Sequence, residues 1–274
     1  MSKFYVGRLA PSPTGLLHLG HAATFWTAYR RACECTGVLL LRNEDLDPQR
    51  SKSEFVEAMV EDLEWLGIAW EPPMVSQSER GELYRAAFEQ LIDAGFVYPC
   101  GCSRRDLVRM MHAPHEDVDD EPVYDGRCRP VGEALSRSLV PGMNYRFRVP
   151  DGEAVRFVDG NVGAQVFTAG VDFGDFLVWR KDGLPSYQLA CVVDDAATGI
   201  TEVVRGADLL KSTARQILLQ RALGLSGLSY FHTRLMVDEL GVRLAKRHDA
   251  LAVRTLRQRG LSREGVLAML DGTV

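Results

Sequence analysis

The stretch from Gly7 to His21 constrains this chain more than any other, because it places two prolines, two histidines and three glycines between two regular elements. The run Lys3 to Val6 predicts a short buried strand, and Thr24 to Arg31 predicts a helix. His18 and His21 then share one face of the first helical turn, where unpaired backbone N–H groups attract anions. The stretch therefore predicts a strand–turn–helix that binds an anionic ligand. An ordinary turn with two surface histidines is the alternative.

Length and composition indicate one large globular unit, with room for an insert. The chain has 274 residues, of which 46% are hydrophobic, and this is enough for a sizeable core. It contains no apolar run of about 18 residues, and Met1 to Phe4 lacks the pattern of a signal peptide. We therefore expect a cytoplasmic protein without a membrane partner.

The net charge of −5 means that an RNA partner would need a local basic patch. Residues 243–263 contain seven basic side chains and one acid, so they form a local positive zone. This zone could contact ATP or RNA phosphates, or it could be a solvated helix face.

A second apolar run, Val38 to Arg42, ends in an acidic segment. The run is typical of a buried strand in a parallel sheet, and ligands of such sheets bind beyond the carboxyl ends of the strands. Glu44 lies at that edge and is a candidate binding residue, although clustered acids also occur in solvated loops. Amphipathic periodicity predicts packing helices over Ser53 to Leu66 and Leu83 to Ile92.

The second half of the chain predicts more strands. Met143 to Val149 and Ala154 to Asp159 are expected to pair with each other, and Phe176 to Lys181 forms another strand. A strand from Thr201 ends at Arg205, and Asp208 is expected to cap the helix that follows.

Arg8 and Arg205 each stand near the carboxyl end of a predicted strand. A planar guanidinium pairs bidentately with a carboxylate, so these two arginines are the candidate cations of a pocket for an acidic ligand. The residues alone do not say which carboxylate each one meets.

Residues 98–130 differ from the rest of the chain and predict a loop-rich insert. Clustered cysteines in a reducing compartment favour a metal over a disulfide, and a metal would stabilise an insert that is too small for its own core. The candidate thiolates for a tetrahedral zinc ion are Cys100, Cys102 and Cys128.

The residues leave the fourth metal ligand open between His112, His115 and Tyr124. A tyrosine is the less usual choice, because its phenol must lose a proton with a pKa of about 10. Cys33 and Cys35 diverge on a helix, and we expect them to be structural.

The stretch from Arg8 resembles the first signature of the class I aminoacyl-tRNA synthetases, most of all that of the glutamate-specific subgroup. The matching residues are Arg8-Leu9-Ala10-Pro11-Ser12-Pro13-Thr14-Gly15 followed by His18-Leu19-Gly20-His21. The segment Glu44-Asp45-Leu46-Asp47-Pro48-Gln49-Arg50 matches the same family. The resemblance implies an α/β fold with a Rossmann-like parallel sheet and helices on both of its faces.

The resemblance also implies a role for each matching residue. The residues implied for glutamate binding are Arg8, Leu9, Ala10, Pro11, Ser12, Glu44, Tyr187 and Arg205. Those implied for ATP binding are His18, Gly20, His21 and Lys246, with catalytic roles for His18, His21 and Lys246. Glu44 would meet the α-amino group, and Tyr187 would line the amino-acid pocket. Lys246 belongs to a loose match to the second class I signature, in which Ala245 replaces the serine.

The chain is similar to a short branch of the family, the glutamyl-queuosine tRNA(Asp) synthetases, which carry Cys-x-Cys and then Tyr-x-x-x-Cys as zinc ligands. This resemblance implies that Tyr124 is the fourth ligand of one structural Zn²⁺ per chain. Few residues follow Lys246, so no anticodon-binding domain is expected. The implied organisation is a first catalytic half over 1–97, a zinc-bearing insert over 98–150 and a second catalytic half over 151–274.

The implied substrates are ATP with Mg²⁺, L-glutamate and tRNA(Asp) carrying queuosine, and we expect the chain to act as a monomer. Other functions remain open. They are a catalytically weakened tRNA-binding paralogue, a nucleotidyltransferase on the same type of sheet, and a truncated synthetase that charges a tRNA 3′ end.

Overall fold

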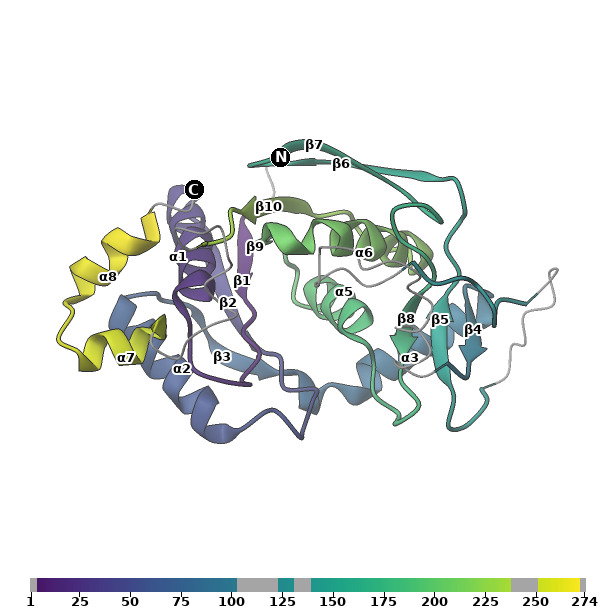
Figure 1. The fold of residues 1–274 in the computed structure, drawn as a ribbon, viewed down its shortest axis with the longest axis horizontal. Helices are drawn as coiled ribbons and strands as arrows, with labels where there is room; N and C mark the ends of the chain where they lie inside the picture. Colours follow the sequence, from purple (N-terminus) through teal and green to yellow (C-terminus); the bar gives the residue numbers. More distant parts are fainter. Residues whose placement is uncertain (1–3, 103–122, 131–138, 238–250, 272–274) are drawn as a thin grey trace.

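A computed structural model describes residues 4–102, 123–130, 139–237 and 251–271 (Figure 1). The helices are α1 (Leu19–Glu34), α2 (Ser53–Leu66), α3 (Gly81–Asp93), α5 (Tyr187–Ala197), α6 (Leu210–Ala222), α7 (Val253–Gln258) and α8 (Arg263–Leu270). The strands are β1 (Val6–Leu9), β2 (Val38–Asn43), β3 (Glu71–Ser76), β4 (Val97–Cys100), β5 (Asn144–Phe147), β6 (Ala154–Asp159), β7 (Gly163–Thr168), β8 (Phe176–Trp179), β9 (Glu202–Gly206) and β10 (Ser229–Thr233). Two 3-10 turns, η1 (Gln77–Glu79) and η2 (Ala207–Leu209), precede α3 and α6.

Parallel strands form the centre of the molecule. One sheet has the order β1-β2-β3, and in a second, ordered β7-β6-β10-β9, strands β6, β10 and β9 run parallel. Strand β1 lies beside β9, because Thr201 donates its backbone N–H to the carbonyl of Val6 at 2.8 Å (Figure 1). The carboxyl ends of β1, β2 and β9 are therefore brought to neighbouring positions, which is the edge where ligands bind in such sheets.

A third, antiparallel sheet of β4, β5 and β8 lies at the opposite end of the molecule from α7 and α8 (Figure 1). Two hydrophobic clusters support this arrangement. One packs α1 and α2 around β2, with Leu41 and Leu63 fully buried. The other packs α3, α5 and α6 against β5 and β8, where Phe88 stacks on Trp179 with ring centroids 4.6 Å apart. Within the described ranges, no helix is long and apolar enough to cross a membrane.

The first predicted elements are correct in type but shifted in position. The strand predicted over Lys3 to Val6 is β1, which begins at Val6, and α1 begins at Leu19, ahead of the predicted Thr24. Apolar runs locate the buried part of an element better than its ends, and the two prolines leave the chain free to enter the helix as soon as the turn is complete.

Two predictions for the second half of the chain are wrong. Strand β5 pairs with β4 and β8, whereas β6 pairs with β7 and β10, so the segments at 143–149 and 154–159 do not pair with each other. The actual partner of β6, Gly163–Thr168, alternates weakly in hydrophobicity and was not predicted as a strand. Asp208 does not cap α6, because it lies within η2 and the residue that precedes α6 is Leu209.

A fully buried carboxylate, Asp194 on α5, joins the two halves of the molecule. It accepts hydrogen bonds from Gln77 Nε2 at 2.8 Å, Arg80 Nε at 2.7 Å and Tyr84 Oη at 2.9 Å. These donors come from η1, α3 and the turn between them. Because buried charges are tolerated only when they are paired, this carboxylate fixes the position of α3 against α5.

Replacing Asp194 with alanine should lower the free energy of unfolding by about 3–5 kcal/mol, because it leaves the Arg80 guanidinium and two buried polar groups without their partner. Urea unfolding followed by circular dichroism measures this change. The matched control is Asp182→Ala, which removes an exposed pair with Arg180 and should cost no more than about 1 kcal/mol. Equal losses in the two variants would contradict the anchoring role of Asp194.

Candidate active site and metal centre

Charged side chains from three elements meet at the carboxyl ends of β1 and β2. The Asp195 carboxylate on α5 accepts a hydrogen bond from Arg42 Nη1 at 2.5 Å and lies 3.4 Å from Arg8 Nε. Arg42 also donates to Glu44 Oε1 at 3.0 Å, and the thiol of Cys191 donates to the same oxygen at 3.4 Å. The structure thus places Arg8 and Glu44 in one cluster, as predicted.

The Arg8 guanidinium is already paired in this cluster. Its Nη1 donates to the Val204 carbonyl at 2.9 Å, and its charge faces Asp195. Burial of Asp195 opposes ionisation, but Arg42 and Arg8 beside it hold the pKa of its carboxyl below the ordinary value. Asp195 therefore stays charged at neutral pH and orients both arginines.

Arg205, at the end of β9, has a different environment. It is 5% exposed, and its three hydrogen bonds go to neutral acceptors: His232 Nε2 at 3.3 Å, Gln216 Oε1 at 2.8 Å and Thr213 Oγ1 at 2.7 Å. Within the described part of the chain, no carboxylate forms an ion pair with it. A buried cation without a counter-ion is costly, so this guanidinium is suited to an anionic ligand.

Tyr187, at the start of α5, interacts electrostatically with charged residues at the carboxyl ends of β1, β2 and β9. The residue is 40% exposed overall, but burial of its hydroxyl end and the neighbouring Cys191 raise the pKa of the phenol, while Arg205 and Arg8 oppose this rise. The hydroxyl is therefore neutral at physiological pH. The charges of Glu44, Arg205 and Arg8 all act on the phenol of Tyr187, so these four of the eight residues predicted to bind glutamate lie within electrostatic reach of one another.

The segment after β1 shapes the other wall of this region. The Pro11 carbonyl accepts a hydrogen bond from the backbone N–H of Glu44 at 2.9 Å, which links the two strand ends. Leu9 is fully buried, whereas Ser12 is exposed. Ala10 lies between them and is partly buried, so these residues contribute mainly backbone to the site.

His18 is the N-cap residue of α1, and its side chain makes no capping hydrogen bond. Its Nδ1 is buried and has no hydrogen-bond partner among the described residues. His21 is exposed one turn later, and a Cβ built on Gly20 would meet no atom within 4 Å. The start of α1 therefore offers helix N–H groups, an available imidazole nitrogen and open space above a glycine.

Two other predictions lie outside the described residues. Lys246, with the rest of the segment from Arg243 to Arg247, belongs to 238–250. The histidines considered as metal ligands, His112 and His115, belong to 103–122.

Several residues of the site were not predicted from the sequence. The pattern at Arg42 predicts only the end of an apolar strand, and the sequence alone assigns no role to Asp194 or Asp195. Two consecutive acids inside an otherwise apolar helix were the signal that could have found them, because such acids must be paired when they are buried. His232, on β10, carried no comparable signal.

His232 is fully buried between Arg205 and Asp159. Its Nδ1 lies 2.6 Å from Asp159 Oδ2, and its Nε2 receives the Arg205 hydrogen bond. Burial and the Arg205 charge lower the pKa of His232 to about 4, although Asp159 opposes this shift. The imidazole is therefore neutral at physiological pH.

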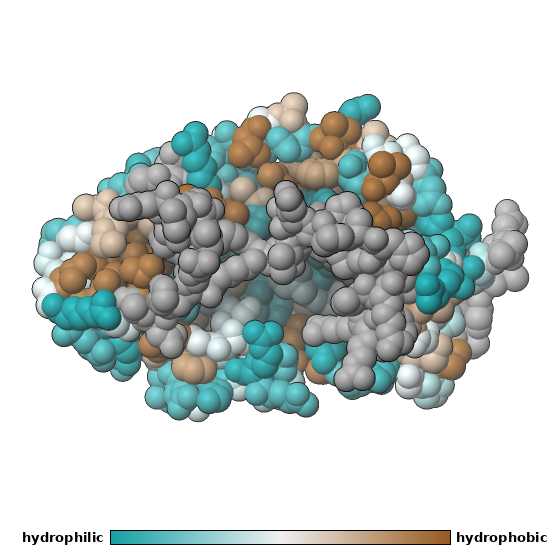
Figure 2. Space-filling model, viewed as in Figure 1, coloured by the Kyte–Doolittle hydropathy of each residue, from teal (hydrophilic) through white to brown (hydrophobic). Residues whose placement is uncertain are grey.

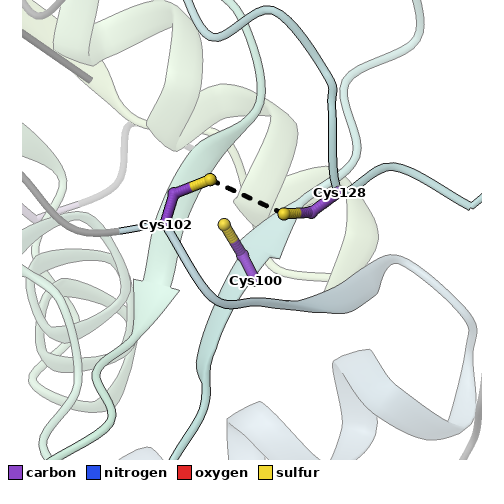
Figure 3. Close-up of side chains that lie close together, drawn as sticks. All are labelled: Cys100, Cys102 and Cys128. Atoms are coloured by element: carbon purple, nitrogen blue, oxygen red, sulfur yellow. Dashed lines mark hydrogen bonds between the residues drawn. The ribbon is translucent and has the colours of Figure 1, made fainter. Parts of the chain in front are cut away.

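Three thiols converge beside the end of β4 (Figure 3), and the phenol of Tyr124 lies next to them. The sulfur atoms of Cys100, Cys102 and Cys128 all lie within 4.8 Å of one another, with Cys102 and Cys128 at 3.6 Å. The Tyr124 hydroxyl lies 3.5 Å from the sulfurs of Cys100 and Cys102. Ligands about 2.3 Å from a tetrahedral ion would be about 3.8 Å apart, so these four side chains fit one metal ion.

A buried guanidinium supports the fit of a metal. Arg146, on β5, is 3% exposed and donates from Nε to the Cys100 sulfur at 3.4 Å and from Nη1 to the Asp175 carbonyl at 2.9 Å. Its guanidinium also lies 4.1 Å from the centre of the Tyr124 ring. No carboxylate of the described residues pairs with Arg146, so thiolates on a bound metal would supply the missing negative charge.

Two of these side chains hold their protons strongly without a metal. Burial raises the pKa of Cys102 to about 11, and burial together with hydrogen bonds from the neighbouring thiols raises the pKa of Tyr124. Burial also opposes ionisation of Cys128, but hydrogen bonds, that with Tyr124 first, lower the pKa of its thiol. A metal ion that binds Cys102 and Tyr124 must therefore displace their protons. Cys33 and Cys35 are exposed and form no disulfide, and they lie apart from this cluster, on and just after the end of α1.

Comparison with known proteins gives matches along almost the whole chain. Residues 5–271 match the family described as tRNA synthetases class I (E and Q), catalytic domain. The chain is 44% identical to the Glutamyl-Q tRNA(Asp) synthetase of Symbiobacterium thermophilum, over 98% of this chain and 87% of that protein. It is 39% identical to the glutamate–tRNA ligase of Aquifex aeolicus, over 96% of this chain and 56% of that protein.

Among solved structures, the chain resembles the glutamate–tRNA synthetase of Elizabethkingia anophelis with a TM-score of 0.75 and 28% sequence identity. The match covers 94% of this chain and 54% of that one, so this chain spans about half the length of the solved enzyme.

Purified protein should contain about one tightly bound metal ion per chain, and Cys102→Ala should lose most of it, because three ligands remain for a four-coordinate ion. Inductively coupled plasma mass spectrometry after dialysis against a weak chelator measures the content. Cys33→Ala, at an exposed cysteine outside the cluster, is the control and should keep the ion. Loss of the ion in His115→Ala together with full retention in Tyr124→Phe would contradict the ligand set.

The low pKa of His232 predicts a pH dependence of stability. Between the unfolded pKa of about 6.5 and the folded value of about 4, only the unfolded chain binds this proton, so the free energy of unfolding should fall as pH drops through that window. The lowered pKa values of Asp159 and Asp195 act in the same direction, but only below about pH 4. Urea titrations from pH 7 to pH 4.5 measure the slope, which should be smaller in His232→Phe. An unchanged slope in that variant would show that His232 does not cause the pH dependence of stability.

Proposed function

Because this chain belongs to the class I tRNA synthetase family for glutamate and glutamine, we propose that it activates L-glutamate with ATP and transfers the glutamate to queuosine at the wobble position of tRNA(Asp). The observation that carries the first step is Arg205, a buried guanidinium that is hydrogen-bonded only to neutral acceptors among the described residues. A carboxylate ligand would supply the missing counter-charge.

The cluster at β1 and β2 would hold the other end of the amino acid. Both contacts of Glu44, with Arg42 and Cys191, go to Oε1, so its Oε2 has no hydrogen-bond partner among the described residues and suits an α-ammonium group. Arg8 and the Tyr187 hydroxyl would complete the pocket. Glutamine has a neutral amide in place of the side-chain carboxylate, so it would leave a buried guanidinium unpaired at a cost of about 3–5 kcal/mol.

Activation requires in-line attack of the glutamate α-carboxylate on the α-phosphate of ATP, with pyrophosphate as the leaving group. The start of α1 supports the phosphates through helix N–H groups and through the imidazoles of His18 and His21. Lys246 would add a cation, and Gly20 would leave room for the adenine. Mg²⁺ would arrive with ATP, and no covalent enzyme intermediate is needed.

For the metal centre we propose structural zinc, bound by Cys100, Cys102, Tyr124 and Cys128. Three sulfur ligands favour zinc over magnesium or calcium, which prefer oxygen. The ion would join the end of β4 to the described residues 124–128, next to the sheet that packs against α3 and α5.

The queuosine acceptor rests on the relatives. The match covers 87% of a protein named Glutamyl-Q tRNA(Asp) synthetase but only 56% of a glutamate–tRNA ligase, and identity is higher to the former. A hydroxyl of the queuosine cyclopentene ring would attack the mixed anhydride and release AMP. One chain would carry the whole site and act as a monomer.

Glutamate-dependent exchange of pyrophosphate into ATP should occur without tRNA, and glutamine should support it at least about a hundredfold less well. Arg205→Leu should raise the KM for glutamate by at least about tenfold, because it removes the cation that pairs with the side-chain carboxylate. The same assay tests adenylate formation itself: absence of any exchange by the metal-loaded protein would favour a binding paralogue over an enzyme.

Transfer of labelled glutamate tests the acceptor. The label should reach tRNA(Asp) that contains queuosine and has lost its 3′ adenosine, and it should not reach queuosine-free tRNA(Asp) with an intact 3′ end. Periodate treatment destroys the queuosine diol and should abolish acceptance. The opposite pattern, transfer only to intact 3′ ends, would identify an ordinary charging enzyme.

A further inference from the structure

The orientation of Arg205 is set by only a few contacts. Of its five N–H bonds, three are directed to His232, Gln216 and Thr213, so two have no partner among the described residues and could meet a ligand. The Nε contact is one of the three that orient the guanidinium plane, and its acceptor is the Nε2 atom of His232 at 3.3 Å. The Thr213 hydroxyl, which accepts from Arg205 Nη2, lies 3.1 Å from the same nitrogen. This nitrogen can accept only if it carries no proton.

Asp159 determines where the His232 proton lies. Its Oδ1 accepts three backbone N–H groups, from Asn161 at 2.9 Å, Val162 at 3.0 Å and His232 at 3.2 Å. Its Oδ2 faces His232 Nδ1 at 2.6 Å. These contacts hold Asp159 as a carboxylate, which can only accept, so the histidine proton must lie on Nδ1. Nε2 is then an acceptor for its two neighbours, the Arg205 Nε–H and the Thr213 hydroxyl.

We propose that Asp159 and His232 are positioning residues that hold the Arg205 guanidinium for the side-chain carboxylate of the acidic substrate, and that they thereby set its preference over the neutral amide. This inference rests on the proposed glutamate substrate. The three residues end neighbouring strands or lie close to their ends, since β10 pairs with both β6 and β9. The pairing of these strands thus fixes the position of the Asp159 carboxylate relative to His232 and Arg205.

A purely structural role is the competing explanation, because a buried His–Asp pair would also stabilise the junction of β6 and β10. The two explanations differ in what they predict for the substrates. Loss of a structural pair should affect ATP and glutamate alike, whereas loss of positioning should affect glutamate alone.

The Asp159→Asn variant replaces the carboxylate that accepts the His232 proton by an amide of nearly the same volume. The single amide oxygen should stay with the three backbone N–H groups, so the amide NH₂ should face His232 Nδ1 and donate to it. The ring proton would then move to Nε2, where it opposes the Arg205 Nε–H. We expect the KM for glutamate to rise by about tenfold or more, with the KM for ATP within about twofold of the unaltered protein.

The matched control is Tyr230→Phe, at a residue on the same strand as His232. It removes a buried hydrogen bond with Gln220 at 3.1 Å and keeps the aromatic ring. It should lower the thermal midpoint without changing the KM for glutamate. The ratio of kcat/KM for glutamate to that for glutamine should fall in Asp159→Asn and stay constant in Tyr230→Phe. Equal changes in the KM values for glutamate and ATP, or no change in either, would overturn the proposal.

A measurement on the unaltered protein covers the case in which Asp159→Asn does not fold. Nitrogen-15 NMR of labelled histidine distinguishes the two neutral tautomers, and the His232 signal should report a proton on Nδ1 at pH 7. A proton on Nε2, or on both nitrogens, would overturn the proposal whatever the substrate. Absence of glutamate-dependent exchange in the unaltered protein would instead reject the proposed function and leave this test in force.

Discussion

The pairing of buried carboxylates on α5 with arginines from the first half of the chain is the interaction on which the rest of the structure depends. Asp194 and Asp195 are consecutive in sequence but point to different partners. Asp194 holds α3 through Arg80 and Tyr84, and Asp195 holds the ends of β1 and β2 through Arg8 and Arg42. One turn of helix therefore joins the structural core to the wall of the pocket.

The buried arginines fall into two groups: those that face carboxylates of the protein, and those that have no carboxylate partner among the described residues. Arg8 and Arg42 face carboxylates of the protein itself, which offset part of their charge. Arg205 and Arg146 are equally buried, yet among described residues they contact only neutral groups. A fold tolerates such cations when a bound anion supplies the counter-charge, and here Arg205 lies in the region proposed to bind glutamate and Arg146 contacts the Cys100 thiol.

Much of this arrangement was predictable from the sequence, and the exceptions have physical causes. Apolar runs located β1, β2 and β9, and since parallel strands end at one edge, Arg8, Glu44 and Arg205 could be placed together. Strand partners could not be predicted, because β5 and β6 are adjacent in sequence but pair elsewhere through long-range packing.

Residues that act by positioning another residue could not be predicted from the sequence either. Arg42 lies near the end of the apolar strand β2 and His232 lies in the short strand β10, and their importance comes from partners distant in the chain, Asp195 and Asp159. The cysteine spacing did predict that Cys100, Cys102 and Cys128 lie together, because thiols are rare enough for their spacing to carry information.

The hairpin of β6 and β7 is exposed, although its first strand ends at the buried Asp159. Val158 and Val166 lie on its outer surface, 76% and 52% exposed, and hydrophobic side chains are visible along this upper edge of the molecule in Figure 2. The same strand ends at Asp159, inside the protein. A macromolecule that bound the hairpin would therefore contact a strand that ends at one of the two residues proposed to position Arg205.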